Sequence, residues 1–118
     1  MADGQNRYDV TATFAKWLHE QVQSNAPAVV LLYRSQPADP KRQVPEKELD
    51  DIAAACGEND LAFAAVNTRM VDKAFDTLEV QPGTPKVVFV RGGKGAGTTL
   101  LNPRLAPFED WIEDRLKP

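Results

Sequence analysis

Any thiol chemistry of this protein would have to use Cys56, because it is the only cysteine among the 118 residues. A cysteine acts as a nucleophile or redox centre as an accessible thiolate, preferably one of lowered pKa. Cys56 instead follows Leu49, Ile52 and Ala53 at helical spacing, on an apolar stripe where a cysteine is expected to be a small buried hydrophobe. We therefore predict a structural role for Cys56, with a redox-sensing or metal-bound cysteine as the alternative.

The other side chains that could do chemistry lack partners in the sequence. His19 is the single histidine, and one histidine far from one cysteine makes a poor metal site. Ser35 has no histidine near it in sequence, although a nucleophilic serine needs a base. The acidic pairs Asp50–Asp51 and Glu109–Asp110 lie in helical patterns, where carboxylates are usually solvated. We predict no catalytic residue, no metal and no cofactor.

The glycine-rich segment "GGKGAG" (Gly92–Gly97) invites comparison with a phosphate-binding loop. It lacks the Gly-Lys-Ser/Thr ending of such loops, and a strand pattern rather than a helix pattern follows it. We interpret it as the turn of a β-hairpin. The neighbouring Lys86 and Lys94 are expected to be surface charges rather than phosphate ligands.

Composition and charge exclude several classes of protein. The chain is 42% hydrophobic and carries a formal charge of -3, so it lacks the basic excess of a nucleic-acid-binding domain. No 18-residue apolar stretch predicts a membrane span, and residues 1–10 lack the apolar core of a secretory signal. We expect a single cytoplasmic domain over residues 1–118, with residues 1–6 flexible. We also expect this domain to be a monomer that binds neither nucleic acid nor membranes.

Two kinds of apolar pattern alternate along the chain. Short runs rich in β-branched residues predict strands at "AVVLLY", "LAFAAVN", "KVVFV" and "TTLL", and a weaker strand is expected near Arg7–Val10. Helical spacing predicts four helices: one capped by Thr11 and ending near Ser24, one with Pro45 at its first position, one capped by Thr68, and one starting at Pro107. The order predicts an α/β protein with a mixed sheet of four or five strands and helices on both faces.

The apolar faces of these helices identify the expected core. The first helix places Phe14, Trp17, Leu18 and Val22 on one side, and the third places Val71, Ala74, Phe75 and Leu78 together. The last helix is expected to direct Phe108, Trp111, Ile112 and Leu116 inward.

In their order and spacing, several segments resemble the thioredoxin family. They are "AVVLLYRSQPADPKR", "PEKELDDIAAAC", "LAFAAVNT" and "LEVQPGTPKVVFVRGGK". The last is the most specific, because it is similar to the family segment in which a glycine and a cis-proline lead into a strand and a Gly-Lys hairpin. The resemblance covers about Val10 to Leu116 and implies a thioredoxin-like fold.

The same resemblance shows that the family's redox motif is missing. Its nucleophilic cysteine falls on Ala38 and its resolving cysteine on Lys41, with Asp39 and Pro40 between them. The tryptophan before the first cysteine falls on Pro37. Alanine has no nucleophile and an ammonium group cannot resolve a mixed disulfide, so thiol–disulfide exchange has no reacting atoms at these positions.

Two further positions also lack the residues that support redox chemistry in the family. The buried acid that assists proton transfer falls on Leu32, and the tryptophan after the strand falls on Arg34. A carboxylate buried without a thiol to assist would be an uncompensated cost, so a leucine suits a member without redox activity. The resemblance therefore implies a redox-inactive member of the family and not an enzyme.

What the resemblance leaves as a function is binding of an extended polypeptide beside the cis-proline, which is strand-like recognition that needs no sulfur. The implied cis bond is Thr84–Pro85. The expected groove comprises Arg34, Pro37, Ala38, Asp39, Pro40, Lys41, Thr84, Pro85 and Lys86. Its cations, with Arg42 nearby, favour an acidic or phosphorylated segment of a protein partner, as in an adaptor or co-chaperone.

Two alternatives remain open at this point. One is an atypical thioredoxin or tryparedoxin relative that uses Cys56 or binds a thiol compound beside Pro85. The other is a domain that dimerises through a helix face carrying Trp17 or Trp111, although such tryptophans more often anchor the core.

Overall fold

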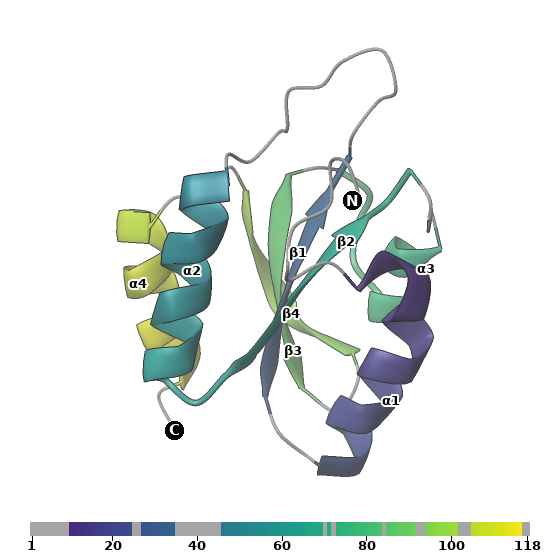
Figure 1. The fold of residues 1–118 in the computed structure, drawn as a ribbon, viewed down its shortest axis with the longest axis horizontal. Coiled ribbons are helices and arrows are strands. Elements are labelled where there is room, and N and C mark those ends of the chain that lie inside the picture. The colour runs from purple at the N-terminus through teal and green to yellow at the C-terminus, as the bar shows by residue number, and fades with distance from the viewer. Residues whose placement is uncertain are drawn as a thin grey trace.

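A four-stranded sheet lies between two pairs of helices in the computed structural model, which describes residues 10–24, 27–34, 46–69, 71, 73–83, 85–91, 94–101 and 105–116. α1 (Phe14–Ser24) and α3 (Ala74–Leu78) cover one face (Figure 1). α2 (Glu46–Glu58) and α4 (Leu105–Leu116) cover the other. The predicted α/β architecture with helices on both faces is confirmed.

The sheet is mixed, as predicted, with the order β2-β1-β3-β4. β1 (Ala28–Tyr33) and β2 (Ala62–Asn67) are parallel and joined through α2, because parallel neighbours need a crossover connection. β3 (Lys86–Arg91) runs antiparallel to β1, and β4 (Lys94–Leu101) runs antiparallel to β3.

The additional strand expected near residues 7–10 lies outside the described residues apart from Val10. The backbone N–H of Val10 donates a hydrogen bond of 2.9 Å to the carbonyl of Ala65. Val10 therefore lies beside the outer edge of β2, in the place that a fifth strand would take.

The fully buried sequence of β1 divides between two hydrophobic cores. Val29, Leu31 and Tyr33 belong to the core under α2 and α4. Ala28, Val30 and Leu32 belong to the core under α1 and α3. A strand that is covered on both faces needs apolar residues at every position, which explains the continuous run "AVVLLY".

The apolar stripes of α2 and α4 were predicted correctly in most positions. Buried residues are Leu49, Ile52, Ala55 and Cys56 in α2 and Phe108 and Ile112 in α4. α4 begins at Leu105, two residues earlier than expected, so Pro107 lies within the first turn. A proline is tolerated there, because the first N–H groups of a helix have no partner inside the helix.

The start of α1 differs from the prediction. A 3₁₀ turn over Thr11–Thr13 precedes α1, so Thr11 lies within this turn instead of capping α1, and Val10 takes the N-cap position of the turn. Val22, which was expected in the core, is 45% exposed. Gln21 takes the half-buried position instead, since it follows Leu18 by three residues and lies closer to the buried face.

The third helix was predicted to start at Thr68, but α3 is a five-residue helix that begins at Ala74. Thr68 is buried and its hydroxyl donates to the carbonyl of Tyr33, so it joins two strands rather than capping a helix. The short helix ends at Leu78. The next residue, Glu79, has φ +59°, and the N–H of Val80 donates a hydrogen bond to the carbonyl of Phe75.

The hairpin turn is shorter than predicted. β4 begins at Lys94, so Gly95–Gly97 belong to the strand and not to the turn. The pairing of β3 with β4 changes register between Val88 and Val90, where Val88 faces Thr99 and Val90 faces Gly95. A bulge of this kind adds residues on one strand, and it falls in the glycine-containing part of β4.

Among the described helices, none combines the length with the apolar content that crossing a bilayer would require.

Candidate functional site

Three chain segments that are distant in sequence meet at one end of the sheet (Figure 1). β1 and β2 are parallel and end together, with Tyr33 paired to Asn67. β3 is antiparallel to β1 and begins there, because Lys86 pairs with Leu32. The residues around this end form what we call the sheet-end surface: Arg34, Thr68, Arg69, Pro85 and Lys86.

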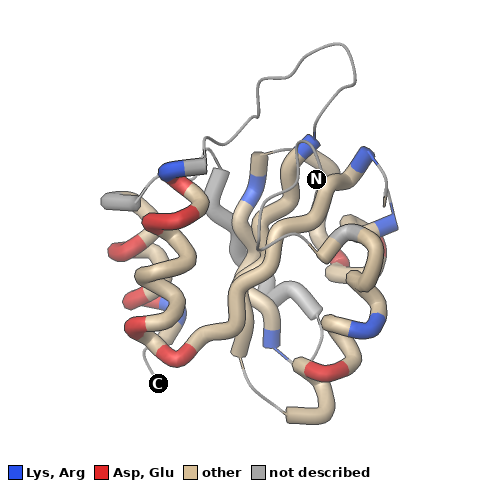
Figure 2. The backbone as a smooth tube through the Cα atoms, viewed as in Figure 1, with Lys and Arg blue, Asp and Glu red and all other residues tan. Residues whose placement is uncertain are grey.

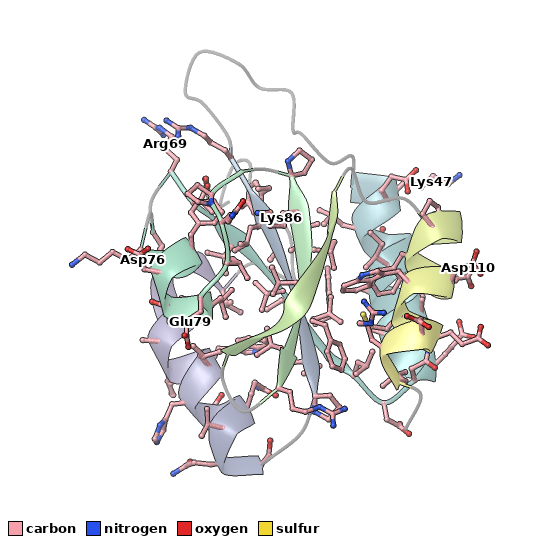
Figure 3. The ribbon with its side chains drawn as sticks, turned by 180° about the vertical axis from the view of Figure 1, so that it is seen from behind. Lys47, Arg69, Asp76, Glu79, Lys86 and Asp110 are labelled. Carbon is pink, nitrogen blue, oxygen red and sulfur yellow. The ribbon has the colours of Figure 1, made fainter. Side chains whose placement is uncertain are left out.

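Thr68 fixes the position at which β2 leaves the sheet. Its backbone N–H donates a hydrogen bond of 2.8 Å to the carbonyl of Tyr33, and its hydroxyl donates one of 3.1 Å to the same oxygen. The next residue, Arg69, donates its backbone N–H to Oδ1 of Asn67 at 3.1 Å. These bonds hold the exit of β2 against the exit of β1 and leave the Arg69 side chain exposed (Figure 3).

The structure brings together three of the residues that the sequence predicted for a binding groove: Arg34, Pro85 and Lys86. Pro37, Ala38, Asp39, Pro40, Lys41 and Thr84 lie outside the described residues, as does Arg42. The cis form of the Thr84–Pro85 bond therefore stays a prediction.

Sequence reasoning missed Arg69. This residue follows β2 in the same way that Arg34 follows β1, and the carboxyl ends of parallel strands reach the same edge of a sheet. The predicted strand–helix–strand unit contained that signal. The structure therefore adds an exposed arginine to the cations expected at this end.

Lys86 was expected to be a surface charge, and this expectation was wrong, because the residue is only 5% exposed. Lys86 opens β3 and alternates with Val88 and Val90, which face the core under α1 and α3. Its Nζ donates a hydrogen bond to the carbonyl of Gln81 and lies 5.9 Å from the ring centroid of Phe75. Burial lowers the pKa of the Lys86 ammonium below its ordinary value of 10.5.

The residue that occupies the position of the family's buried acid is indeed buried, since Leu32 has no exposed surface. Leu32 pairs with Lys86 across β1 and β3. An apolar side chain therefore stands beside the buried ammonium, where a carboxylate would have compensated its charge.

Cys56 takes no part in the sheet-end surface. It belongs to the core under α2 and α4, on the opposite face of the sheet from the core that contains Leu32. It has no exposed surface, and burial raises the pKa of its thiol to about 12. The prediction of a buried structural cysteine is confirmed, because the thiol has neither the access nor the thiolate character that exchange chemistry needs.

A hollow of about 210 Å³ lies between α2 and α4. It is lined by Ala55, Glu58, Asn59, Glu109, Ile112 and Glu113. Within the described ranges, no group of three or more histidine, cysteine or acidic side chains is arranged to hold a metal ion. We therefore keep the sheet-end surface as the candidate site.

No protein-family model matches the sequence, and no curated protein matches it. Solved structures of thioredoxins do resemble the fold. A thioredoxin h from poplar is 15% identical with a TM-score of 0.63, and the match covers 92% of this chain and 93% of that one. The oxidised thioredoxin of Plasmodium falciparum is 12% identical with a TM-score of 0.64, over 87% of this chain and 92% of that one.

Thioredoxin O2 of Arabidopsis thaliana, in its oxidized state, gives a similar result, with 15% identity, a TM-score of 0.62, and coverage of 91% and 90% of the two chains. These likenesses show a thioredoxin-like fold over nearly the whole chain. The fold that the resemblance implied is thus confirmed, and the chain carries that fold with one cysteine and no Cys-x-x-Cys motif.

Proposed function

We propose that the protein is a polypeptide-binding module that uses the sheet-end surface and carries out no thiol–disulfide exchange. The observation that carries this proposal is the contrast between the two places where chemistry could occur. Pro85 and the cations Arg34, Arg69 and Lys86 gather at one sheet end, while the single thiol is buried in the opposite core.

Pro85 supplies the reason for an extended polypeptide as the ligand. A proline has no N–H to donate, so Pro85 cannot extend the backbone pairing of β3 beyond Lys86, where the strand begins. In the family that the sequence resembles, the residue before this proline offers its N–H and C=O to a bound chain. We infer that Thr84 takes the same role, as one strand adding to another.

The cations at the sheet-end surface fit a binding role better than a catalytic one. Arg34 and Arg69 are exposed, and exposed arginines attract and orient acidic partners through charge. Adaptor, scaffold and co-chaperone functions all use recognition of this kind. We expect the protein to act in the cytoplasm, as a monomer that binds a partner.

The competing function is an oxidoreductase that uses Cys56, and an insulin-reduction assay separates the two. The thiolate fraction of a group whose pKa is about 12 is on the order of 10⁻⁵ at pH 7. We expect wild type to reduce insulin no faster than the dithiothreitol background, and Cys56→Ala to behave identically. Turnover above background that disappears in Cys56→Ala would establish the oxidoreductase and remove the binding proposal.

A further inference from the structure

The buried ammonium of Lys86 has more N–H donors than the described residues around it have acceptors for them. An ammonium group has three N–H donors. Within the described part of the chain, one acceptor bonds to Nζ, the carbonyl of Gln81, and the Phe75 ring adds a contact at 5.9 Å. Two donors of a residue that is only 5% exposed are therefore left for another acceptor.

No negative charge compensates Lys86 from the described residues, where no carboxylate forms an ion pair with its Nζ. Its partners across the sheet are Leu32 on β1 and Leu101 on β4, and both are apolar. A buried cation without a counterion is unfavourable, and the lowered pKa of Lys86 has the same cause.

The segment 81–83, which lies beside this ammonium, is exposed to solvent. Gln81, whose carbonyl accepts the hydrogen bond from Nζ, is exposed, as are the next two residues, Pro82 and Gly83. Gly83 has φ +139°, and the nearest atom to the position of a Cβ on it would be Nζ of Lys86, at 3.9 Å. The missing side chain thus leaves space directly beside the ammonium, next to Pro85.

We propose that Lys86 anchors an acidic side chain, Asp or Glu, of the polypeptide segment that lies on the sheet-end surface. The carboxylate would accept the N–H groups that the protein leaves unused and would supply the missing counterion, in a charge-assisted hydrogen bond. This inference rests on the proposed function and gives the chemistry of its partner. Lys86 offers a single positive charge beside the apolar side chains of Leu32 and Phe75, so we expect it to bind one carboxylate. Arg34 and Arg69 lie at exposed positions of the sheet-end surface.

The test uses two peptides that differ in one group. Both are extended heptapeptides capped by acetyl and amide, Thr-Val-Ser-Glu-Ser-Val-Thr and the same sequence with Gln in place of Glu, so the Glu side chain is the only carboxylate. Calorimetry of the wild-type protein should give about tenfold tighter binding of the Glu peptide, since a charge-assisted hydrogen bond is worth about that factor. Lys86→Met should bind both peptides equally.

Arg91→Met is the matched control, because Arg91 is an exposed cation at the other end of the same strand. This variant should keep the preference for the Glu peptide. A second measurement needs no variant: in wild type with ¹³Cε-labelled lysine, the Lys86 signal should shift with the Glu peptide and stay in place with the Gln peptide.

Equal binding of the two peptides to wild type, or a preference that survives in Lys86→Met, would overturn the anchor and leave polypeptide binding intact. Absence of binding by both peptides would also overturn it. A different result would overturn the proposed function itself: insulin reduction that depends on Cys56.

Discussion

Cys56 and Lys86 are two buried titratable residues on opposite faces of the sheet, and burial moves their pKa values in opposite directions. The thiol is neutral when protonated, so burial favours the protonated form. The ammonium is charged when protonated, so burial disfavours it. Cys56 is therefore inert packing, while Lys86, a member of the sheet-end surface, carries a charge that no described carboxylate compensates.

Burial of Cys56 predicts a specific loss of stability in alkali. Its pKa is about 12 in the folded protein and about 9 in an unfolded chain. The folded state thus holds its proton more tightly, and the stability that this thiol contributes is complete below pH 9 and is lost as pH rises toward 12. Between pH 8.5 and 10.5 this loss amounts to about 2 kcal/mol.

Urea unfolding of wild type and Cys56→Ala at the two pH values measures this effect. The variant keeps every tyrosine and lysine, so the titration of those groups cancels in the comparison. We expect wild type to lose about 2 kcal/mol more than Cys56→Ala over this interval. Equal losses in the two proteins would show that the thiol ionises as easily in the folded state as in the unfolded one.

Lys86 also shows where residue-level prediction failed. A lysine that follows a proline at the start of a strand is normally assigned to the surface. Its burial depends on Phe75 and Gln81, which come from the segment before β3 and close over the side chain. Periodicity reports which face of β3 Lys86 occupies, but it does not report that a loop will cover that face.

At the scale of elements, prediction succeeded where apolar periodicity was strong and failed at the ends. β1, β2, β3 and the buried faces of α2 and α4 followed from residue spacing. The first residues of α3 and β4 were not predicted from residue spacing, because they depend on tertiary hydrogen bonds and on sheet pairing. Thr68 has the residue type of a helix cap, but the carbonyl of Tyr33 takes its hydroxyl.

Replacement of Thr68 tests whether this bond holds the strand ends together. Thr68→Val keeps the shape of the side chain and removes its hydrogen bond to Tyr33, which should reduce the free energy of unfolding by about 1 kcal/mol. Thr77→Val, on the exposed side of α3, is the control and should change it by less than about 0.5 kcal/mol. Urea denaturation measures both, and equal effects would mean that the Thr68 hydroxyl contributes nothing to the sheet-end surface.

At the scale of the whole molecule, acidic residues are concentrated on the face of the sheet that α2 and α4 cover. α2 and α4 together carry nine acidic and two basic residues, and the rest of the chain carries eight acidic and twelve basic ones. Figure 2 shows the acidic positions gathered over these two helices. An acidic partner is therefore repelled from this face and attracted elsewhere, an effect that salt screens beyond about 10 Å.

The overall charge of -3 concealed this separation, and the sequence order of the segments alone did not reveal it. The folding of α2 and α4 onto one face of the sheet brings the two acidic segments together. In the same way, the juxtaposition of Arg34, Arg69 and Lys86 required the strand order, since these residues lie 17 or more positions apart along the chain.

Capture of binding partners under reducing conditions tests the central claim most directly. The variant Arg34→Glu/Arg69→Glu reverses the two exposed cations of the sheet-end surface, and Lys16→Glu/Arg91→Glu makes the same change of charge at exposed positions outside it. We predict that immobilised wild type and the control variant retain the same proteins, and that the sheet-end variant, shown by circular dichroism to be folded, retains at least tenfold less. Equal retention by the sheet-end variant would contradict polypeptide binding at the sheet-end surface.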